Sequence, residues 1–197
     1  LNILMDQAKE IMKSTYRYVD GEERLYLSDD RYVKINLASS GQQEVVWVFN
    51  LLFYYLSEDK KIFLIIEEPE SHLYPESQRR ISETLSLMVN SGNSVLVTTH
   101  SPYVLGTFNY LLMAGQIEET YQKEVKKKLR KRLWLNAENT NACYIRNGGL
   151  TNGISDEDNL QLIKNELIDG ASTEINDMSD YLLGFLYAEG EAKCPTI

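Results

Sequence analysis

The stretch IFLIIEEPESHLYP, from Ile62 to Pro75, decides the fold. It opens with five consecutive apolar residues, which is typical of a strand that is buried on both faces of a sheet. Two adjacent carboxylates, Glu67 and Glu68, follow at once, and Pro75 then predicts the start of a helix that runs to Val89. The stretch therefore predicts a buried strand with charge at its carboxyl end.

A second strand and a second helix follow. Residues 94–99 form another apolar run, which leads into Thr98-Thr99-His100-Ser101-Pro102, and residues 102–113 have the pattern of a helix. Parallel strands need a crossover between them, so buried strands that alternate with helices predict parallel pairing in an α/β layer architecture.

The segments upstream of this region predict helices and a hairpin. Apolar side chains recur at helical spacing over residues 1–18, and residues 24–37 have the pattern of a hairpin with its turn at 28–30. A further apolar helix extends to about residue 56. Its start offers two possible capping boxes, Ser39 with Gln42 or Ser40 with Gln43.

The chain changes in character after residue 116, so we expect two parts, 1–116 and 117–197. The second part predicts a small α+β appendage. Its expected elements are a charged helix over 117–133, a hairpin over 142–154 around Asn147-Gly148-Gly149, and helices over 159–168 and 173–187.

The charge of the chain is unevenly distributed. The 197 residues carry a net charge of −9, of which residues 133–197 hold −8. This balance argues against indiscriminate nucleic-acid binding but leaves room for a local basic patch.

The sequence contains no apolar run long enough for a membrane span and opens with no signal peptide, and Cys143 and Cys194 have no disulfide or zinc spacing. We expect a reduced, cytoplasmic protein with no membrane partner, and the initial Leu1 indicates a fragment.

The paired carboxylates predict chemistry at an edge of the sheet. Open α/β folds bind ligands at the carboxyl ends of their strands. One carboxylate there can hold Mg²⁺, and the next can orient or deprotonate an attacking water. The alternative is an acidic helix start, since Glu67, Glu68 and Glu70 also suit a helix N-terminus.

Two other groups also have a functional and a structural interpretation. His100, at the end of the second strand, can reach a phosphate, or it can be a structural histidine. The residues from Ser39 to Gln42 lie at a helix N-terminus, where they favour an anion or simply cap the helix. The order and spacing of the helix start at 39–42, the carboxylate pair and His100 indicate a functional site more specifically than any one of these motifs does.

The segment KEVKKKLRKR, residues 123–132, is strongly basic. It predicts either a patch that contacts nucleic-acid phosphates or a solvated helix that balances the acidic tail. Trp134 could stack on a base, but the run 133–135 favours a small core. The candidate nucleic-acid residues are Lys126, Lys127, Lys128, Arg130, Lys131 and Arg132.

This combination of motifs resembles the C-terminal half of an ABC-type ATPase head with a P-loop fold, over about residues 24–115. Residues 38–42 resemble its signature motif, 62–68 its Walker B strand and 71–74 its D-loop, and His100 matches its switch histidine. The run from Glu67 to Pro75 is similar to OLD-like and RecF/SMC-like AAA-type ATPases of DNA repair and anti-phage defence, including the PtuA type.

The resemblance implies a role for each matching residue. Glu68 would activate the attacking water, His100 would contact the γ-phosphate, and Glu67 stands at the Mg²⁺-associated position. The residues implied to contact ATP are Ser39, Ser40, Gly41, Gln42, Ser71 and His72. Such heads hold ATP and Mg²⁺ between head-to-tail subunits of a dimer or higher oligomer, and DNA or an effector nuclease would be further partners.

The main departure from the family is an absence. The sequence G-x-x-x-x-G-K-S/T does not occur, so the loop that cradles the phosphates is missing. We therefore expect a lobe that needs the N-terminal lobe of the same head and is inactive alone. The expected function is Mg²⁺-dependent ATP hydrolysis that gates DNA processing or an effector nuclease. Alternatives are a non-catalytic interaction or dimerisation lobe and, with less support, a transporter nucleotide-binding subunit.

Overall fold

The computed structural model describes residues 1–157, 160–164 and 166–191. The chain divides into two compact units, Leu1–Ile163 and Lys164–Ile197, and each is described by itself. The expected division at residue 116 stays a prediction. Cys194 lies outside the described residues, so the prediction about the two cysteines also remains open.

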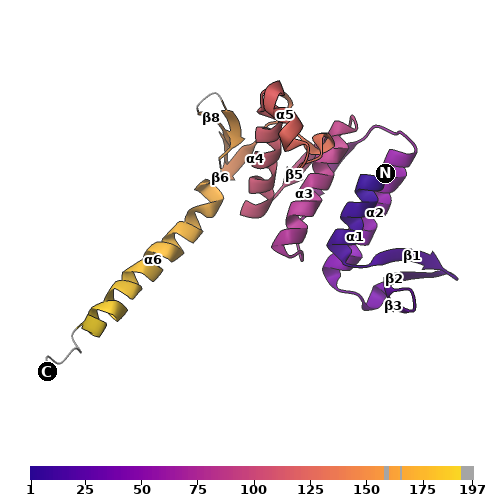
Figure 1. Ribbon diagram of the computed structural model, residues 1–197, viewed down its shortest axis with the longest axis horizontal. Helices are drawn as coiled ribbons and strands as arrows, with labels where there is room; N and C mark the ends of the chain where they lie inside the picture. The colour runs from indigo at the N-terminus through magenta and orange to yellow at the C-terminus, as the bar shows by residue number, and fades with distance from the viewer. Residues whose placement is uncertain (158–159, 165, 192–197) are drawn as a thin grey trace. The chain divides into compact units, whose positions relative to one another are not determined.

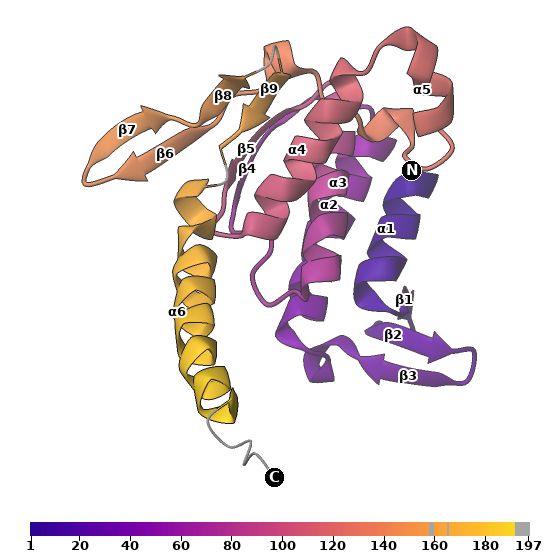
Figure 2. The same cartoon turned by 60° about the vertical axis from the view of Figure 1, so that its left-hand side comes forward.

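The centre of the first unit is a pair of parallel strands. β4 (Phe63–Glu67) pairs with β5 (Ser94–Thr98) so that Ile65 lies opposite Leu96 and Glu67 opposite Thr98. α3 (Pro75–Asn90) connects the two strands, and α4 (Pro102–Gln116) follows β5. Figure 2 shows α3 and α4 on one side of this sheet. The predicted α/β architecture of parallel strands with flanking helices is confirmed.

The expectation that both strands are buried on both faces is wrong within the first unit. Along β4 and β5 the side chains alternate between half-buried and exposed. Phe63 is 65% exposed, Ile65 59% and Leu96 49%. Successive side chains of a strand point to opposite faces, and the described helices α3 and α4 cover only one of them. Within the described residues of the first unit, one face of the sheet is therefore apolar and carries no covering helix, and we call it the open face.

Helices pack side by side around α3. α1 (Asn2–Met12) lies against both α3 and α2 (Ser40–Ser57), and α4 lies on the other side of α3 (Figure 1). The side chains between these helices form the core. Among its most deeply buried members are Leu4, Leu52, Ile81, Leu85, Met88, Leu111 and Leu112.

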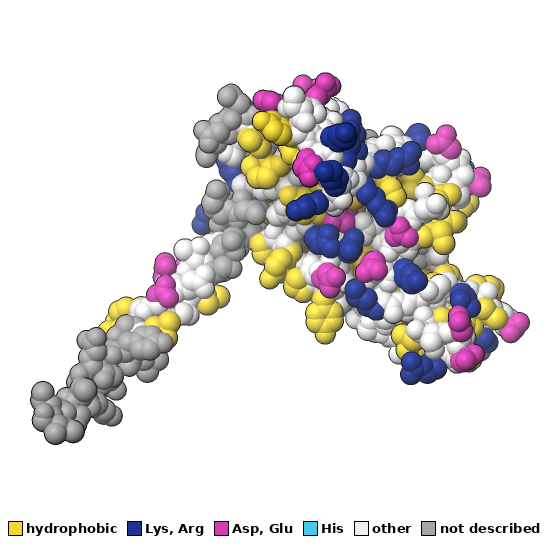
Figure 3. Space-filling model, viewed as in Figure 1, with side chains coloured by type: hydrophobic (Ala, Val, Ile, Leu, Met, Phe, Trp, Pro, Cys, Tyr) yellow, Lys and Arg dark blue, Asp and Glu magenta, His cyan; other side chains and the backbone are white. Residues whose placement is uncertain are grey.

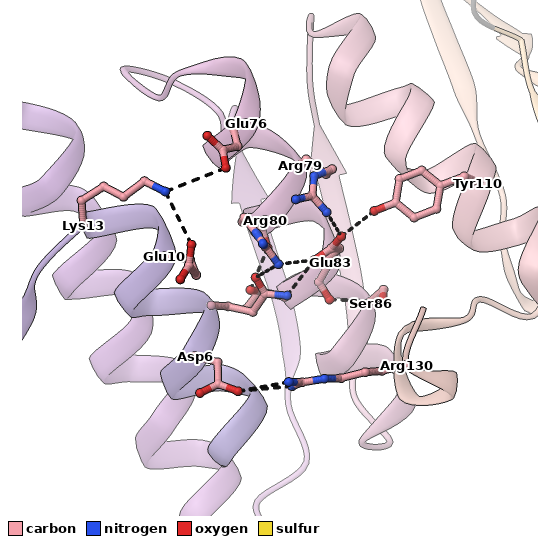
Figure 4. Close-up of polar contacts among 12 residues, drawn as sticks. Asp6, Glu10, Lys13, Glu76, Arg79, Arg80, Glu83, Ser86, Tyr110 and Arg130 are labelled. Carbon is pink, nitrogen blue, oxygen red and sulfur yellow. Dashed lines mark hydrogen bonds and ion pairs between the residues drawn. The ribbon is translucent and has the colours of Figure 1, made fainter. Parts of the chain in front are cut away.

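A buried carboxylate joins three of these helices. Glu83 on α3 is 2% exposed and accepts hydrogen bonds from Gln7 of α1 at 2.7 Å, Arg79 at 2.7 Å and Tyr110 of α4 at 2.6 Å (Figure 4). Arg80 adds an ion pair at 3.5 Å. Three hydrogen bonds satisfy the charge, which is the condition for burying it. The helical pattern of the sequence did not predict this cluster.

The first helix is shorter than predicted, and a strand follows it. α1 ends at Met12, where Lys13 takes a left-handed conformation with φ of 52°. β1 (Thr15–Val19), β2 (Glu22–Ser28) and β3 (Arg31–Lys34) then form an antiparallel meander. The expected hairpin over 24–37 is confirmed in β2 and β3. The helix expected to reach residue 18 is wrong, because Asp20 and Gly21 both have positive φ and form a tight hairpin turn.

The region from 117 to 163 matches its prediction only in part. α5 (Glu119–Val125) ends early, and Lys131–Leu133 is a short 3-10 helix, so the continuous helix over 117–133 is wrong. β6 (Cys143–Arg146) and β7 (Gly149–Asn152) confirm the hairpin, with Asn147 and Gly148 at positive φ in its turn. Two further 3-10 helices lie at Ile35–Leu37 and Ala137–Asn139.

The helix expected over 159–168 is wrong in its first half. β8 (Ile154–Glu157) and β9 (Leu160–Ile163) pair antiparallel there, while residues 158, 159 and 165 lie outside the described part of the chain. Amide side chains of α4 form hydrogen bonds with the backbone of β9 along the edge where a third strand would otherwise pair. Asn109 exchanges two hydrogen bonds with the backbone of Ile163, and Gln116 does the same with Gln161.

The second unit contains α6 (Glu166–Glu191), a single helix that includes the one predicted over 173–187. Its exposed apolar side chains include Ile175, Met178, Leu182 and Phe185. No helix within the described residues has the length and apolarity needed to span a membrane.

Candidate functional site

The carboxylates of the Ile62–Pro75 stretch lie at the carboxyl end of β4. Glu67 is the last residue of the strand, and its side chain is exposed. Glu68 follows with φ of 42°, while its N–H still donates to the carbonyl oxygen of Thr98 at 2.8 Å. A positive φ is uncommon for a residue with a side chain and is often found at functional sites. The chain therefore turns sharply at Glu68 while its backbone remains bonded to β5.

Glu68 and His100 meet at this edge of the sheet. His100 Nε2 lies 3.4 Å from Glu68 Oε1, and Ser71 Oγ donates to Glu68 Oε2 at 3.3 Å. The His100 side chain is 88% exposed and that of Glu68 is 50% exposed. Three residues predicted from separate motifs thus lie together, and both side chains of the pair are accessible to a ligand.

The carboxylates do not form an acidic helix start. α3 begins at Pro75, and the acidic residue of its first turn is Glu76. Glu67, Glu68 and Glu70 lie in the strand end and turn that precede it. The structural alternative for these carboxylates is therefore wrong.

Glu70 is a functional candidate that its position in the sequence alone does not identify. It is 8% exposed, and its Oε1 accepts hydrogen bonds from Thr99 Oγ1 at 2.5 Å and from the backbone N–H of His100 at 3.1 Å. The sequence signal was its place in the Glu-Glu-Pro-Glu run, but the run alone could not name its partners. Its carboxylate joins the turn after β4 to the turn after β5.

The turn that carries His100 has a second anchor. Ser101 Oγ accepts from the N–H groups of Tyr103 and Val104, so Ser101 caps α4. The same hydroxyl donates to Gln78 Oε1 at 2.6 Å, and Gln78 Nε2 donates to the Leu73 carbonyl oxygen at 2.9 Å. α3 therefore connects both turns.

The start of α2 settles which capping box forms. Ser39 Oγ accepts from the N–H of Gln42 at 3.3 Å, and Gln42 Oε1 accepts from the N–H of Ser39 at 3.2 Å. This pair, and not Ser40 with Gln43, makes the box. The side chains of Ser39 and Gln42 thus cap the helix, while Ser40 is exposed at its first position. Anion binding at this end stays a prediction.

Gly41 connects this helix start to the turn after β4. A Cβ atom at position 41 would lie 2.5 Å from the His72 carbonyl oxygen. His72 has φ of 60°, and its Nδ1 lies 3.1 Å from Oε1 of Glu44 on α2. The predicted residues Gly41 and His72 are therefore in direct contact, and the turn from Glu68 to His72 links them to the Glu68–His100 pair.

Glu67, whose exposed carboxylate ends β4, is the residue that fits a metal ion at this edge. Oxygen donors suit Mg²⁺, which takes one or two carboxylates together with substrate phosphates and water. No group of three or more His, Cys, Asp or Glu side chains that could hold a metal occurs within the described residues. The donor set thus fits an ion bound jointly with a phosphate ligand, and not a cage made by the protein alone.

The basic segment is exposed but partly paired. Lys127 forms an ion pair with Glu124 at 2.6 Å, Arg130 with Asp6 at 3.3 Å, and Lys131 donates to Gln122 at 3.4 Å. Figure 3 shows Lys and Arg side chains gathered over the face of the first unit that carries α3 and α5. The exposed candidates are Lys126, Lys127, Lys128, Arg130, Lys131 and Arg132.

Trp134 belongs to a small core. Trp134 and its neighbours Leu133 and Leu135 are each at most 6% exposed, and the indole Nε1 donates to the Leu129 carbonyl oxygen. The ring is thus not available to stack on a base, and the small-core interpretation is confirmed.

Comparisons with known proteins agree with the motifs. A family model described as an AAA ATPase domain matches residues 2–105. An uncharacterized protein of Methanocaldococcus jannaschii is 28% identical over 82 residues, which cover 42% of this chain and 10% of that protein. The chain thus spans about a tenth of the length of this relative.

A solved structure described as concerning ATP-driven dimerization and DNA stimulated activation of SMC ATPases is also similar. The match covers 89% of this chain and 92% of that one, with 12% identity and a TM-score of 0.46. The family model, in contrast, matches more than half of the chain at the level of sequence. The protein therefore belongs to the AAA ATPase domain family.

Proposed function

We propose that this AAA-type ATPase domain takes part in Mg²⁺-dependent ATP hydrolysis at the interface of a dimer. The observation that carries the proposal is the contact between Glu68 and His100, 3.4 Å apart at the carboxyl end of two parallel strands. Both side chains are accessible, and this edge is where α/β folds bind their ligands. The proposed base and the proposed phosphate-contacting group are therefore adjacent.

Glu68 is the proposed general base. Its backbone is bonded to Thr98, and its two carboxylate oxygens contact Ser71 and His100, so the carboxylate has a defined direction. A carboxylate in this place orients and deprotonates a water molecule that attacks the γ-phosphate. His100 contacts that phosphate from β5. Glu67 is the residue that would hold Mg²⁺, which would neutralise part of the phosphate charge.

The start of α2 is the proposed contact to a nucleotide held by the second subunit. The first N–H groups of a helix have no intrahelical partner and favour an anion. At α2 these groups belong to Ser40 and Gly41, next to the capping pair Ser39 and Gln42. Ser71 and His72 would complete this surface, because Gly41 packs on the His72 carbonyl.

The lobe that supplies the phosphate loop is the proposed partner of the open sheet face. The sequence contains no phosphate loop of its own. Phe63, Ile65 and Leu96 form an exposed apolar strip next to the catalytic edge, and burial of such a strip stabilises an association. The further roles in DNA repair or phage defence, and the effector nuclease, rest on the resemblance of the Glu67–Pro75 run.

The second candidate is a non-catalytic lobe that serves only for association. The missing phosphate loop and the open apolar face favour it. The two proposals differ in one measurable respect. A catalytic lobe needs the carboxylate of Glu68, whereas an association lobe does not.

The test is Glu68→Gln in the full-length protein. We expect ATP turnover to fall at least about 100-fold, because a general base contributes about 10²–10⁴-fold, while ATP-dependent dimerisation remains. Glu76→Gln, an exposed change on α3, is the matched control and should leave both unchanged. Equal turnover of Glu68→Gln and wild type would remove Glu68 as the base. Absence of turnover in the wild type, with dimerisation intact, would favour the association lobe.

A further inference from the structure

We propose that Glu70 is a positioning residue that holds the His100 turn in register with Glu68. This inference rests on the proposed function, since it assigns to Glu70 an effect on hydrolysis exerted through His100. Glu70 does not reach the open edge of the sheet, because its side chain is buried. Its effect on the reaction must therefore pass through the residues that it binds.

The contacts of Glu70 are directed at one turn. Its Oε1 accepts from the hydroxyl of Thr99 at 2.5 Å and from the backbone N–H of His100 at 3.1 Å. Thr99 Oγ1 in turn accepts from the N–H of Ser101 at 3.0 Å. The carboxylate and the Thr99 hydroxyl thus bond two successive N–H groups of the turn, while the His100 side chain remains 88% exposed.

The same short segment carries Glu68. The N–H of Ser71 donates to the Glu68 carbonyl oxygen, and the N–H of Leu73 to that of Glu70, so residues 68–73 form a bonded turn. Glu70 ties this turn to the His100 turn through side-chain bonds, in addition to the backbone bond from Glu68 to Thr98. The distance between Glu68 and His100 therefore depends on Glu70.

Burial of this carboxylate needs an explanation. Oε2 of Glu70 is buried and has no hydrogen-bond partner among the described residues. A buried carboxylate with incomplete pairing lowers stability, whereas a neutral Asn, Ser or Thr side chain can organise a turn without that cost. Hydrogen bonds to an ionised acceptor are about twice as strong as neutral ones. The cost in stability is therefore accompanied by a rigidly held backbone at His100, and we infer that this rigidity is the role of Glu70.

The expected effect is on the chemical step. Misplacement of a reacting group by about 1 Å can cost about 100-fold in rate. Glu70→Ala removes the acceptor of both bonds, so the turn can move relative to Glu68. Glu70→Gln keeps an acceptor oxygen at the same place. We therefore expect kcat to fall at least about tenfold in Glu70→Ala, with KM for ATP within about twofold, and Glu70→Gln to recover most of the loss.

The experiment is a double-mutant cycle in the full-length protein. It compares ATP turnover of the wild type, Glu70→Ala, His100→Ala and the double variant. If Glu70 acts through His100, Glu70→Ala lowers kcat in the wild type and has no further effect in His100→Ala. Thr99→Val, which removes one donor to Glu70, gives an independent second cycle if Glu70→Ala does not fold. Glu76→Ala controls for loss of a carboxylate, and thermal unfolding of each variant checks the fold.

The outcomes distinguish failure of the positioning role of Glu70 from failure of the proposed function. An equal loss from Glu70→Ala in both backgrounds, while His100→Ala is itself impaired, overturns the positioning role and leaves the proposed function intact. Wild-type turnover in His100→Ala overturns the role of His100 and the inference with it. A loss that Glu70→Gln fails to reduce, in a variant that folds normally, also contradicts the inference.

Discussion

Gly41 leaves no room for a side chain against the carbonyl oxygen of His72, because a Cβ atom there would lie 2.5 Å from it. This contact fixes the start of α2 against the turn that leads from Glu68 to α3. The proposed nucleotide-contacting helix and the proposed catalytic turn are thus one packed unit. Its rigidity can be tested at a single position.

Gly41→Ala should lower the free energy of unfolding by about 1–3 kcal/mol, since overpacking of a tight contact has this cost. Because the displaced atom is backbone, the turn itself must shift, and turnover of the full-length protein should fall as well. Gly170→Ala on α6 is the matched control, because a Cβ there meets nothing within 4 Å. Urea unfolding compares the two. Equal stability of both variants would contradict the close approach at Gly41.

Glu83 offers a test of the helical core. Glu83→Ala leaves Arg79, Gln7 and Tyr110 without their shared acceptor. We expect a loss of about 3–5 kcal/mol, the range found when one partner of a buried charge pair is removed. Glu76→Ala, on the same helix, breaks only an exposed ion pair with Lys13 at 3.8 Å and should cost less than about 1 kcal/mol. Chemical denaturation measures both, and similar losses would argue against a central role of Glu83.

Tyr110 predicts how stability responds to alkaline pH. Burial, and then the hydrogen bond and charge of Glu83, raise the pKa of Tyr110 well above its ordinary value of 10.0. Above pH 10 the unfolded tyrosine releases its proton while the folded one keeps it. The free energy of unfolding should therefore fall as pH rises from about 10, by up to about 1.4 kcal/mol per pH unit from this group.

The variant Tyr110→Phe isolates that contribution. It removes the ionisable group, so its stability should decline less steeply than that of wild type between pH 10 and about 11.5. It should be less stable than wild type at pH 7, because Glu83 loses a donor. Urea unfolding of both proteins across this range provides the comparison. Parallel declines would assign the alkaline loss to other groups.

The basic segment predicts salt-dependent nucleic-acid binding. The double variant Lys126→Glu and Lys128→Glu reverses two exposed charges without breaking the pairs made by Lys127 and Arg130. If both lysines contact phosphates, DNA affinity should fall, and the slope of log K against log salt should lose about 2 units. Lys60→Glu with Lys61→Glu changes the net charge equally at another exposed place. If both double variants lower DNA affinity equally, the effect reflects net charge alone and contradicts a specific contact at Lys126 and Lys128.

Local signals in the sequence predicted a large part of the fold. The apolar run after Ile62 and the one after Ser94 predicted the parallel pair, because each strand is marked by a short run of consecutive apolar residues. The Asn147-Gly148 turn was equally clear, since only a few residue types accept its positive φ. The capping box at Ser39 was predicted with one alternative, which the structure resolved.

The missed elements depended on weaker local signals. The turn at Asp20 and Gly21 and the alternating tyrosines at 16 and 18 are the sequence signals of β1. The helical spacing of the preceding apolar residues gives no sign of where α1 ends and β1 begins. The sequence predicts a helix where β9 forms, because four residues are too few to separate the helical period from the strand period. Asn109 and Gln116 supply the edge bonds that make this strand stable, and they lie on α4, about 50 residues away.

The sequence by itself determined which chemical groups stand at the two strand ends, because Glu67 and Glu68 directly follow one apolar run and His100 follows the other after two threonines. Only the tertiary structure decided what holds them. Glu70 binds Thr99, which is 29 residues away, and two of the partners of Glu83, Gln7 and Tyr110, lie on two other helices. It also decided that, among the described residues of the first unit, helices cover one face of the sheet and leave the other exposed. Periodicity reports which side of an element is apolar, whereas burial and pairing depend on which other elements pack against that side.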